Sequence, residues 1–434
     1  MDAVTALTVG LIAWAFSVHL PLVYAVLGLT WLLPTLELVG LRTKREVYFD
    51  VAKGLSRYLI YTYAIGGVFG TIITVFLAGL MPVFTNAAGL LLWPVWGVAT
   101  AFGVAISLPL IGFYYRSFGK MDDRNHIALG YGLAVVTTVI PAMFRLVFAF
   151  INDPVGVVAK PDPKSLVGFD LGVDLWQALG NPAYPPLFLA TLFGAIAFTS
   201  VLIAAIYTWR YAAYRTEYYA VGRGFFAKTA LIFGVLYAAS AAWYLYAVYH
   251  NSPTVAWSIF GSMPAYLPAL QSQLKALGVN IDLAAVYQPT LNLSWLFYLN
   301  LAFGVLVLAF LVASLRGANK ALAAVGLLSV LALMIGAEVM NGLAHLPYAI
   351  VPSPGVAAAL IKAYGVEFAA QVAQTLTVSA LITPSINSLV QLIAAQPWLI
   401  GLSLFMFALF NALVIGGIYM ALSWRSKPQQ PQSQ

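Results

Sequence analysis

Long runs of apolar residues, separated by short charged segments, make up most of this chain of 434 residues. A membrane-spanning helix needs about 20 mostly apolar residues, so the uncharged runs predict spanning helices once they are divided at turn residues. The longest run, Tyr58–Tyr115, is divided at Met81-Pro82 and at Asn86-Ala87-Ala88-Gly89. The pattern predicts nine helices, at residues 3–40, 54–80, 89–115, 127–151, 184–210, 225–250, 291–315, 321–346 and 392–424.

The remaining segments are predicted to connect these helices within one membrane domain, residues 1–426. Three of the connections are long, and we expect them outside the membrane on the external face, at residues 152–183, 250–289 and 347–391. In the second, leucines recur at helical spacing and predict a short amphipathic helix at the surface, at Leu267, Leu270, Leu274 and Leu277. Residues 427–434 are polar and are predicted to form a disordered tail.

Lysine and arginine residues indicate how the helices are oriented, because cytoplasmic loops carry an excess of both. An external N-terminus and a cytoplasmic C-terminus place most of them in the cytoplasm: Arg42, Lys44, Arg45, Lys53, Arg57, Arg116, Lys120, Arg124, Arg210, Arg215, Arg223, Lys228, Arg316, Lys320, Arg425 and Lys427. Only Lys160, Lys164, Lys275 and Lys362 then lie outside. The predicted fold is therefore an all-α integral membrane protein of nine helices with an external N-terminus.

Composition agrees with this prediction and narrows the chemistry. Hydrophobic residues make up 62% of the chain and charged residues only 8%, whereas soluble domains carry about 25% charged residues. The net charge of +7 therefore describes orientation in the membrane, and no nucleic-acid partner is expected. The chain has no cysteine, which excludes disulfides, thiolate-bound iron–sulfur clusters and covalently attached haem.

Three ionisable side chains fall inside predicted helices: His19, Arg145 and Glu338. Each charge inside a bilayer costs about 2.5–3.5 kcal/mol on the insertion scale, so each needs a partner or a purpose. An α-helix rises by 1.5 Å per residue, so all three residues lie about 27–34 Å from the charged residue at the inner end of their helix. This height places them in the outer half of the membrane. A histidine, a carboxylate and a guanidinium at one depth predict a buried polar site.

Each of these residues also has a purely structural interpretation. His19 can donate a hydrogen bond to a neighbouring helix, and Arg145 with Glu338 can form a buried ion pair without a ligand. Glu37 is interpreted as a charge at the inner membrane interface. His345 follows Glu338 by seven residues, shares its helix face and is a candidate second contact for whatever Glu338 holds.

Several short segments give the chain a family resemblance: Val18-His19-Leu20-Pro21-Leu22 with Leu36-Glu37, Asn152-Asp153-Pro154, Asn181-Pro182 and Ala337-Glu338-Val339. With the pattern of helices and charges, they make the chain similar to subunit I of the cytochrome bd quinol oxidases. That resemblance implies nine spans arranged as two four-helix bundles plus one additional helix. It also implies a haem-ligating role for His19 and a role for Glu338 as the carboxylate ligand of a high-spin haem.

The chain departs from the family where other haem ligands are expected. The family's low-spin haem b needs a histidine at the start of helix five and a methionine on helix seven. The matching stretches here, Leu187–Thr191 and Leu299–Phe303, contain neither. Trp96 and Val104 lie near the places where helix three of the family has glutamates. Because haem iron needs axial donors, low-spin haem b is predicted to be absent.

The remaining donors limit the cofactor that the resemblance implies. His19 and Glu338 are left as iron ligands for at most one haem, of b or d type. Arg145 would then balance the charge of Glu338 or of a haem propionate, because a guanidinium pairs well with carboxylates. We assign no catalytic residue.

Two hypotheses of different classes follow. In the first, the chain is a haem-poor subunit of a respiratory bd-type quinol:oxygen oxidoreductase in the plasma membrane. It forms a heterodimer with a haem-complete subunit I-like protein, in contact with lipid and quinol, and is part of a terminal oxidase without being its catalytic centre. In the second, it is a transporter or permease in which Arg145, Glu338 and His19 line a cavity in the outer half of the membrane.

Overall fold

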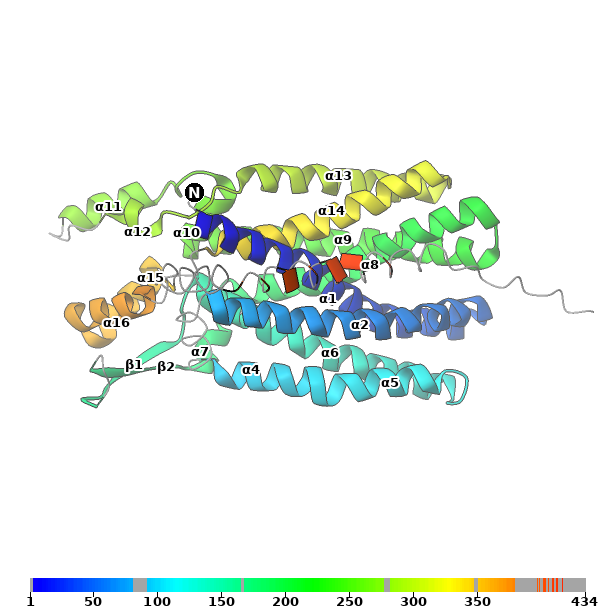
Figure 1. Ribbon diagram of the computed structural model, residues 1–434, viewed down its shortest axis with the longest axis horizontal. Helices are drawn as coiled ribbons and strands as arrows, with labels where there is room; N and C mark the ends of the chain where they lie inside the picture. Colours follow the sequence, from blue (N-terminus) through cyan, green and yellow to red (C-terminus); the bar gives the residue numbers. More distant parts are fainter. Residues whose placement is uncertain are drawn as a thin grey trace, which may run out of the picture.

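The computed structural model describes residues 3–80, 92–164, 168–276, 282–346 and 350–378, with scattered positions between 396 and 416. Its long helices run side by side along the longest axis of an elongated molecule (Figure 1). The predicted turn at Met81-Pro82, most of the predicted ninth helix at 392–424 and the tail at 427–434 lie outside the described residues.

The long helices pack as two groups of four. The members of the first are α1 (Ala3–Thr43), α2 (Glu46–Leu80), a composite third helix and α6 (Asp123–Asn152). The composite helix consists of α4 (Trp93–Thr100), a π-helical segment (Ala101–Ser107) and α5 (Leu108–Ser117). The members of the second are α8 (Tyr184–Tyr214), α9 (Glu217–Asn251), α13 (Ser294–Arg316) and α14 (Lys320–Ala344). The two-bundle architecture expected from the sequence is therefore present.

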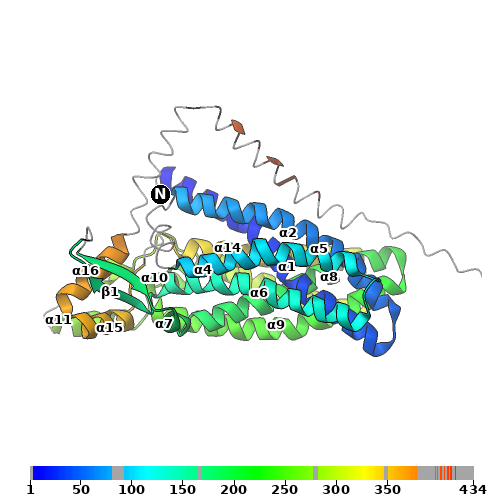
Figure 2. The same cartoon turned by 90° about the horizontal axis from the view of Figure 1, so that it is seen from below.

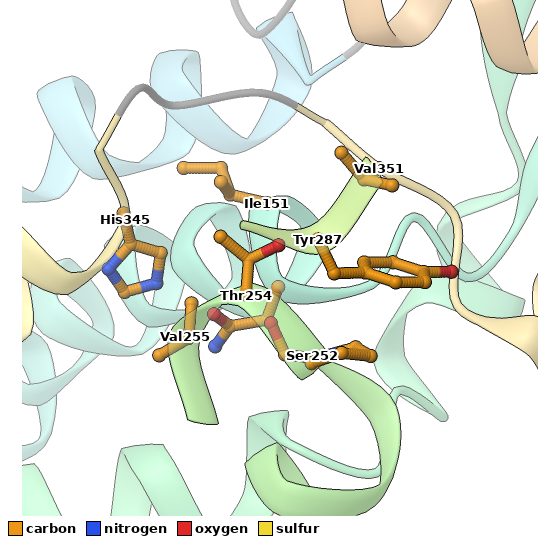
Figure 3. A pocket seen from close by; sticks show the side chains of 9 residues that line it. Ile151, Ser252, Thr254, Val255, Tyr287, His345 and Val351 are labelled. Carbon is orange, nitrogen blue, oxygen red and sulfur yellow. The ribbon is translucent and has the colours of Figure 1, made fainter. Parts of the chain in front are cut away.

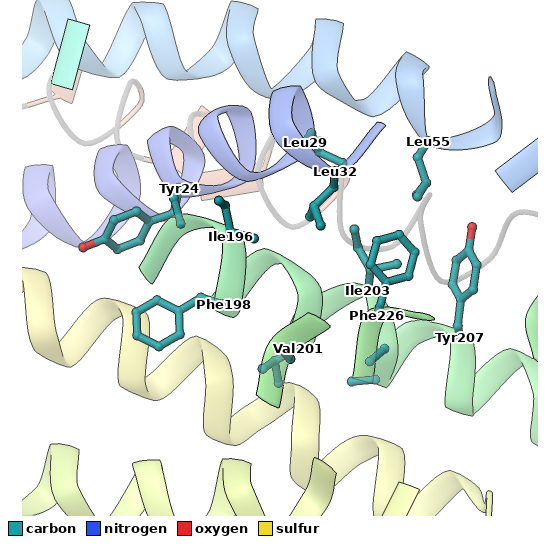
Figure 4. Packing of buried hydrophobic residues seen from close by; sticks show 14 of the residues in the cluster. Tyr24, Leu29, Leu32, Leu55, Ile196, Phe198, Val201, Ile203, Tyr207 and Phe226 are labelled. Atoms are coloured by element: carbon teal, nitrogen blue, oxygen red, sulfur yellow. The ribbon is translucent and has the colours of Figure 1, made fainter. Parts of the chain in front are cut away.

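Helix α1 joins the bundles, because it packs against α8 and α14 as well as against α2 and α6. Buried apolar side chains of α1 and α8 meet along this junction, among them Leu32 and Ile203 (Figure 4). The absence of a side chain at Gly28 allows the closest approach. A Cβ atom there would lie 2.5 Å from the carbonyl oxygen of Ala195 and 2.4 Å from Oγ1 of Thr199, both on α8.

Seven helices of the described part of the chain are long and apolar enough to cross a membrane. They are α1 from Val9, the composite third helix, α6, α8, α9, α13 and α14. Helix α2 covers the predicted second span and is not among these seven. The links α1–α2, α5–α6, α8–α9 and α13–α14, which contain or directly adjoin basic residues, lie at the same end of the molecule (Figures 1 and 2).

Short elements cover the opposite end, where the N-terminus lies (Figure 1). The helices among them are α7 (Leu175–Leu179), α10 (Pro253–Phe260), α11 (Leu267–Ala276), α12 (Leu283–Tyr287), α15 (Pro354–Tyr364) and α16 (Val366–Val378). Helix α11 lies where the leucine spacing predicts an amphipathic helix, and its Leu267 is buried against Leu283 and Tyr287 of α12. We call this set the outer cap, together with the hairpin described next.

The outer cap also contains an antiparallel hairpin that the all-α prediction did not include. Strand β1 (Val157–Pro161) pairs with β2 (Phe169–Val173), with Val157 opposite Val173. Each strand has only five residues, so the alternation that marks a strand is too short to stand out among the Asp and Pro residues of this connection.

Candidate functional site

Arg145 of α6 and Glu338 of α14 form an ion pair between the two bundles. The Arg145 Nη2 atom donates a hydrogen bond of 2.9 Å to Oε1 of Glu338, and only 5% and 3% of the two residues are exposed. The Tyr24 hydroxyl, on α1, donates to the same carboxylate oxygen. Three helices from both bundles therefore converge on one buried carboxylate.

The second oxygen of this carboxylate has a different environment. Glu338 Oε2 is buried and has no hydrogen-bond partner among the described residues. Tyr24 is fixed in turn by its own backbone, because its carbonyl oxygen accepts a 2.9 Å hydrogen bond from Thr199 of α8. The Glu338 carboxylate is thus hydrogen-bonded through Oε1 and keeps an unpartnered acceptor at Oε2.

His19 also lies on α1 but faces another helix. Its Nδ1 atom is 2.9 Å from the carbonyl oxygen of Gly66 on α2, and a Cβ atom on Gly70 would lie 3.0 Å from its Cε1. Tyr24 follows His19 by five residues, a rotation of about 140° around the helix axis. The structure therefore brings Arg145 and Glu338 together and directs His19 to a different face of α1.

The two predicted iron donors differ in how well they fit a haem. When Nδ1 of His19 is protonated and donates to Gly66, Nε2 carries the lone pair, which is the usual arrangement of a metal-ligating histidine. His19 therefore fits a haem iron. The Glu338 carboxylate is more restricted, because Arg145 and Tyr24 engage its Oε1 atom and only Oε2, which has no partner among the described residues, remains to meet an iron. The assignment of both residues as ligands stays a prediction.

Each stretch where a low-spin haem ligand of the family would lie contributes buried side chains to helix contacts. On α8, Leu187, Ala190 and Thr191 are at most 8% exposed. On α13, Asn300 is 7% exposed, and its amide lies against Gly336 of α14, where a Cβ atom would come within 2.1 Å of Oδ1. No histidine or methionine occurs in either stretch.

A second buried polar cluster, Glu37 with Tyr114 and His126, was missed by the sequence analysis. Glu37 is 1% exposed, so it is a buried and partnered group, and its interpretation as a charge at the inner membrane interface stays a prediction. Its Oε2 lies 2.5 Å from Nδ1 of His126 on α6, and the Tyr114 hydroxyl on α5 donates to Oε1. His126 directly precedes the predicted span 127–151, and its position at the edge of a span beside a helix-one acid was the available signal.

Two further titratable groups are buried at the outer ends of the helices. His345, predicted as a second contact for the ligand of Glu338, lies beyond α14, and its Nδ1 is 2.6 Å from the Asn341 carbonyl oxygen. Burial lowers the pKa of His345 to about 4. Burial raises the pKa of Asp153, after α6, to about 6, although hydrogen bonds from Ser353 oppose this shift.

Comparison with known proteins agrees with this architecture. The chain is similar to the bd oxidase from Geobacillus thermodenitrificans, with a TM-score of 0.69 and 18% sequence identity over 96% of this chain and 97% of that one, a likeness of fold. No curated protein matches the chain. The family model for cytochrome bd terminal oxidase subunit I matches residues 10–259, more than half of the sequence. The chain therefore belongs to the cytochrome bd terminal oxidase subunit I family, as a multi-pass plasma-membrane subunit of a bd-type oxidase.

Proposed function

We propose that the chain is the haem-poor accessory subunit of a bd-type quinol:oxygen oxidoreductase, paired with a haem-complete subunit I-like protein. The observation that carries this proposal is the ion pair at Glu338. The carboxylate that matches a haem ligand of the family is bound by Arg145 and Tyr24 of the same chain. An internal cation thus balances the charge of this carboxylate, so no iron is needed to compensate it.

The packing around the low-spin haem positions supports the same proposal. Haem iron of the low-spin type needs two strong axial donors, and leucine, alanine and asparagine side chains cannot replace histidine and methionine. Leu187 and Asn300 are buried in helix contacts at those positions. Electrons from quinol would therefore enter through the partner subunit.

In this role the chain supplies a membrane scaffold. Its long helices would complete the dimer interface and shield the haems of the partner from lipid and water. His19 is the residue that would hold a haem of b or d type, if the chain holds one, and a bound haem would supply a redox-active iron. The chain's own residues would then orient that haem, with the Gly66 carbonyl fixing the imidazole ring.

Absorption spectra of the purified complex and of the separated chain test the proposal. We expect the complex to show haem bands in the reduced-minus-oxidised spectrum and the separated chain to show no low-spin haem b band. A low-spin b band in the separated chain, or purification of the chain without any haem-containing partner, would contradict it. His19→Ala should remove any high-spin band of the separated chain, whereas His250→Ala, a variant at the outer end of α9, should leave it unchanged.

A further inference from the structure

Three polar atoms on α6 and α14 are buried in the outer half of the molecule without a hydrogen-bond partner among the described residues. They are Oε2 of Glu338, Nδ2 of Asn341 and Oδ1 of Asn152. Glu338 and Asn152 are each 3% exposed. Buried polar atoms of native proteins are nearly always hydrogen-bonded, either to protein or to ordered water. The two acceptor atoms and the one donor atom therefore need a partner that can both donate and accept hydrogen bonds.

These atoms follow one another along the helix axes. Asn152 comes seven residues after Arg145 on α6, and His345 comes seven residues after Glu338 at the end of α14. Seven residues are two helical turns, so each pair shares one face and is separated by about 10 Å along the axis. Asn341 lies between Glu338 and His345 on α14. The polar positions thus form a column that leads from the ion pair toward the outer cap.

Tyr244 of α9 connects the lower and upper parts of this column. Its hydroxyl accepts a 3.1 Å hydrogen bond from Nδ2 of Asn152. The same hydroxyl lies within electrostatic reach of both Arg145 and Glu338. Tyr244 therefore adds a hydroxyl to the column beside Asn152.

A small cavity lies at the upper end of the column. It is lined by Asn152, Thr254, Tyr287 and His345 among others (Figure 3). Its volume of about 20 Å³ is enough for about one water molecule, which needs two to four polar partners. Amide, hydroxyl and imidazole groups around the cavity supply such partners, so it is suited to ordered water.

Beyond this cavity, polar groups continue to the surface of the outer cap. Tyr287 lies within electrostatic reach of Asp153 and Tyr266. Tyr266 lines a larger surface pocket of about 380 Å³ together with His250. Polar groups therefore continue from the cavity to a surface pocket of the outer cap.

We propose that a file of ordered water molecules runs from Glu338 Oε2, past Asn341 on α14 and Asn152 on α6, to the outer cap. This file connects the buried carboxylate with the external aqueous phase by hydrogen bonds. The inference does not depend on whether the chain is an accessory subunit or on whether it binds haem.

Radiolytic hydroxyl-radical footprinting of the purified, folded chain tests this proposal, because radicals formed from bound internal water modify the side chains beside them. Tyr244 is expected to be modified several-fold faster than Tyr207, a buried tyrosine of the cytoplasmic half. The exposed Trp176 serves as the positive control. Equal slow modification of Tyr244 and Tyr207, with Trp176 modified rapidly, would overturn the proposal.

A matched pair of variants tests the role of the column itself. Asn152→Leu removes one unpartnered amide from the column and should slow the modification of Tyr244 and His345. Asn300→Leu removes a comparable unpartnered amide, which faces Gly336 on another side of α14, and should leave both rates unchanged. If Asn152→Leu folds normally and does not change the modification of Tyr244, the water file does not pass through Asn152 and the proposal fails.

Discussion

Arg145 and Glu338 lie on helices of different bundles, and they meet through one carboxylate oxygen at 2.9 Å. The contact is almost completely buried, so its two charges depend on each other. A buried pair of this kind stabilises a fold little in net terms but is costly to break, because removal of one partner leaves an uncompensated charge. The pair is therefore suited to specify how the two bundles dock.

Substitution of one residue of the Arg145–Glu338 pair should destabilise the chain more than substitution of both. Arg145→Met or Glu338→Met alone should destabilise the chain by about 3–5 kcal/mol, whereas the double variant should recover most of this loss. Thermal unfolding in detergent measures the difference. The exposed pair Arg45 and Glu217 is the control, and Arg45→Ala should change stability by at most about 1 kcal/mol. A double variant as unstable as the worse single variant would show that the charges do more than compensate each other.

The cluster of Glu37, Tyr114 and His126 should behave as a structural unit. His126→Leu leaves the Glu37 carboxylate buried without its histidine partner and should cost about 3–5 kcal/mol. Tyr114→Phe removes only one hydrogen bond to that carboxylate and should cost about 1.5–3 kcal/mol. Unfolding midpoints of both variants check the order. Equal losses would mean that His126 contributes no charge compensation.

Asp153 should make the chain less stable as the pH rises. Its pKa of about 6 in the folded chain lies above the ordinary value of 3.8, so the folded state keeps a proton that the unfolded chain has lost. Its contribution to stability is therefore fully present below about pH 4 and is lost as the pH rises through 6. Asp153→Asn should remove this dependence, which unfolding midpoints between pH 4 and 7 would show. An unchanged pH profile would exclude Asp153 as its cause.

His345 should make the chain less stable as the pH falls. Its pKa of about 4 in the folded chain lies below the ordinary value of 6.5, so the unfolded chain binds a proton first as the pH falls. The stability that His345 contributes is present above pH 6.5 and decreases toward pH 4. His345→Gln should flatten this decrease without affecting the contribution of Asp153. The variants of Asp153 and His345 measured together separate the two effects, and parallel shifts in both would contradict the assignment.

The close approach of α1 and α8 should depend on the missing side chain at Gly28. Gly28→Ala places a Cβ atom against the backbone of Ala195, which cannot move as freely as a side chain, and should cost about 1–3 kcal/mol or more. Gly67→Ala on α2, where nothing lies within 4 Å, should be neutral or stabilising by up to about 1 kcal/mol. Unfolding midpoints of the two variants provide the comparison. A similar effect in both would mean that helix propensity and not packing decides the result.

The sequence by itself determined which segments of this protein form long, apolar helices. Uncharged runs of sufficient length form the long helices because a backbone in hydrocarbon must satisfy its hydrogen bonds within the segment. The same pattern identified Arg145 and Glu338 as candidate site residues, because a charged residue inside a predicted span is rare and can be recognised from the sequence alone. Their common depth, counted along the helices, agrees with the contact that they make.

Only the tertiary structure decided which polar groups meet and which face apart. His19 and Tyr24 are close in sequence, yet helix rotation directs one to α2 and the other to Glu338. Glu37 became buried because α5 and α6 bring Tyr114 and His126 against it. Periodicity fixes where a side chain lies along its own helix, but the partner of a buried charge depends on how separate helices rotate and pack against one another, which no local pattern encodes.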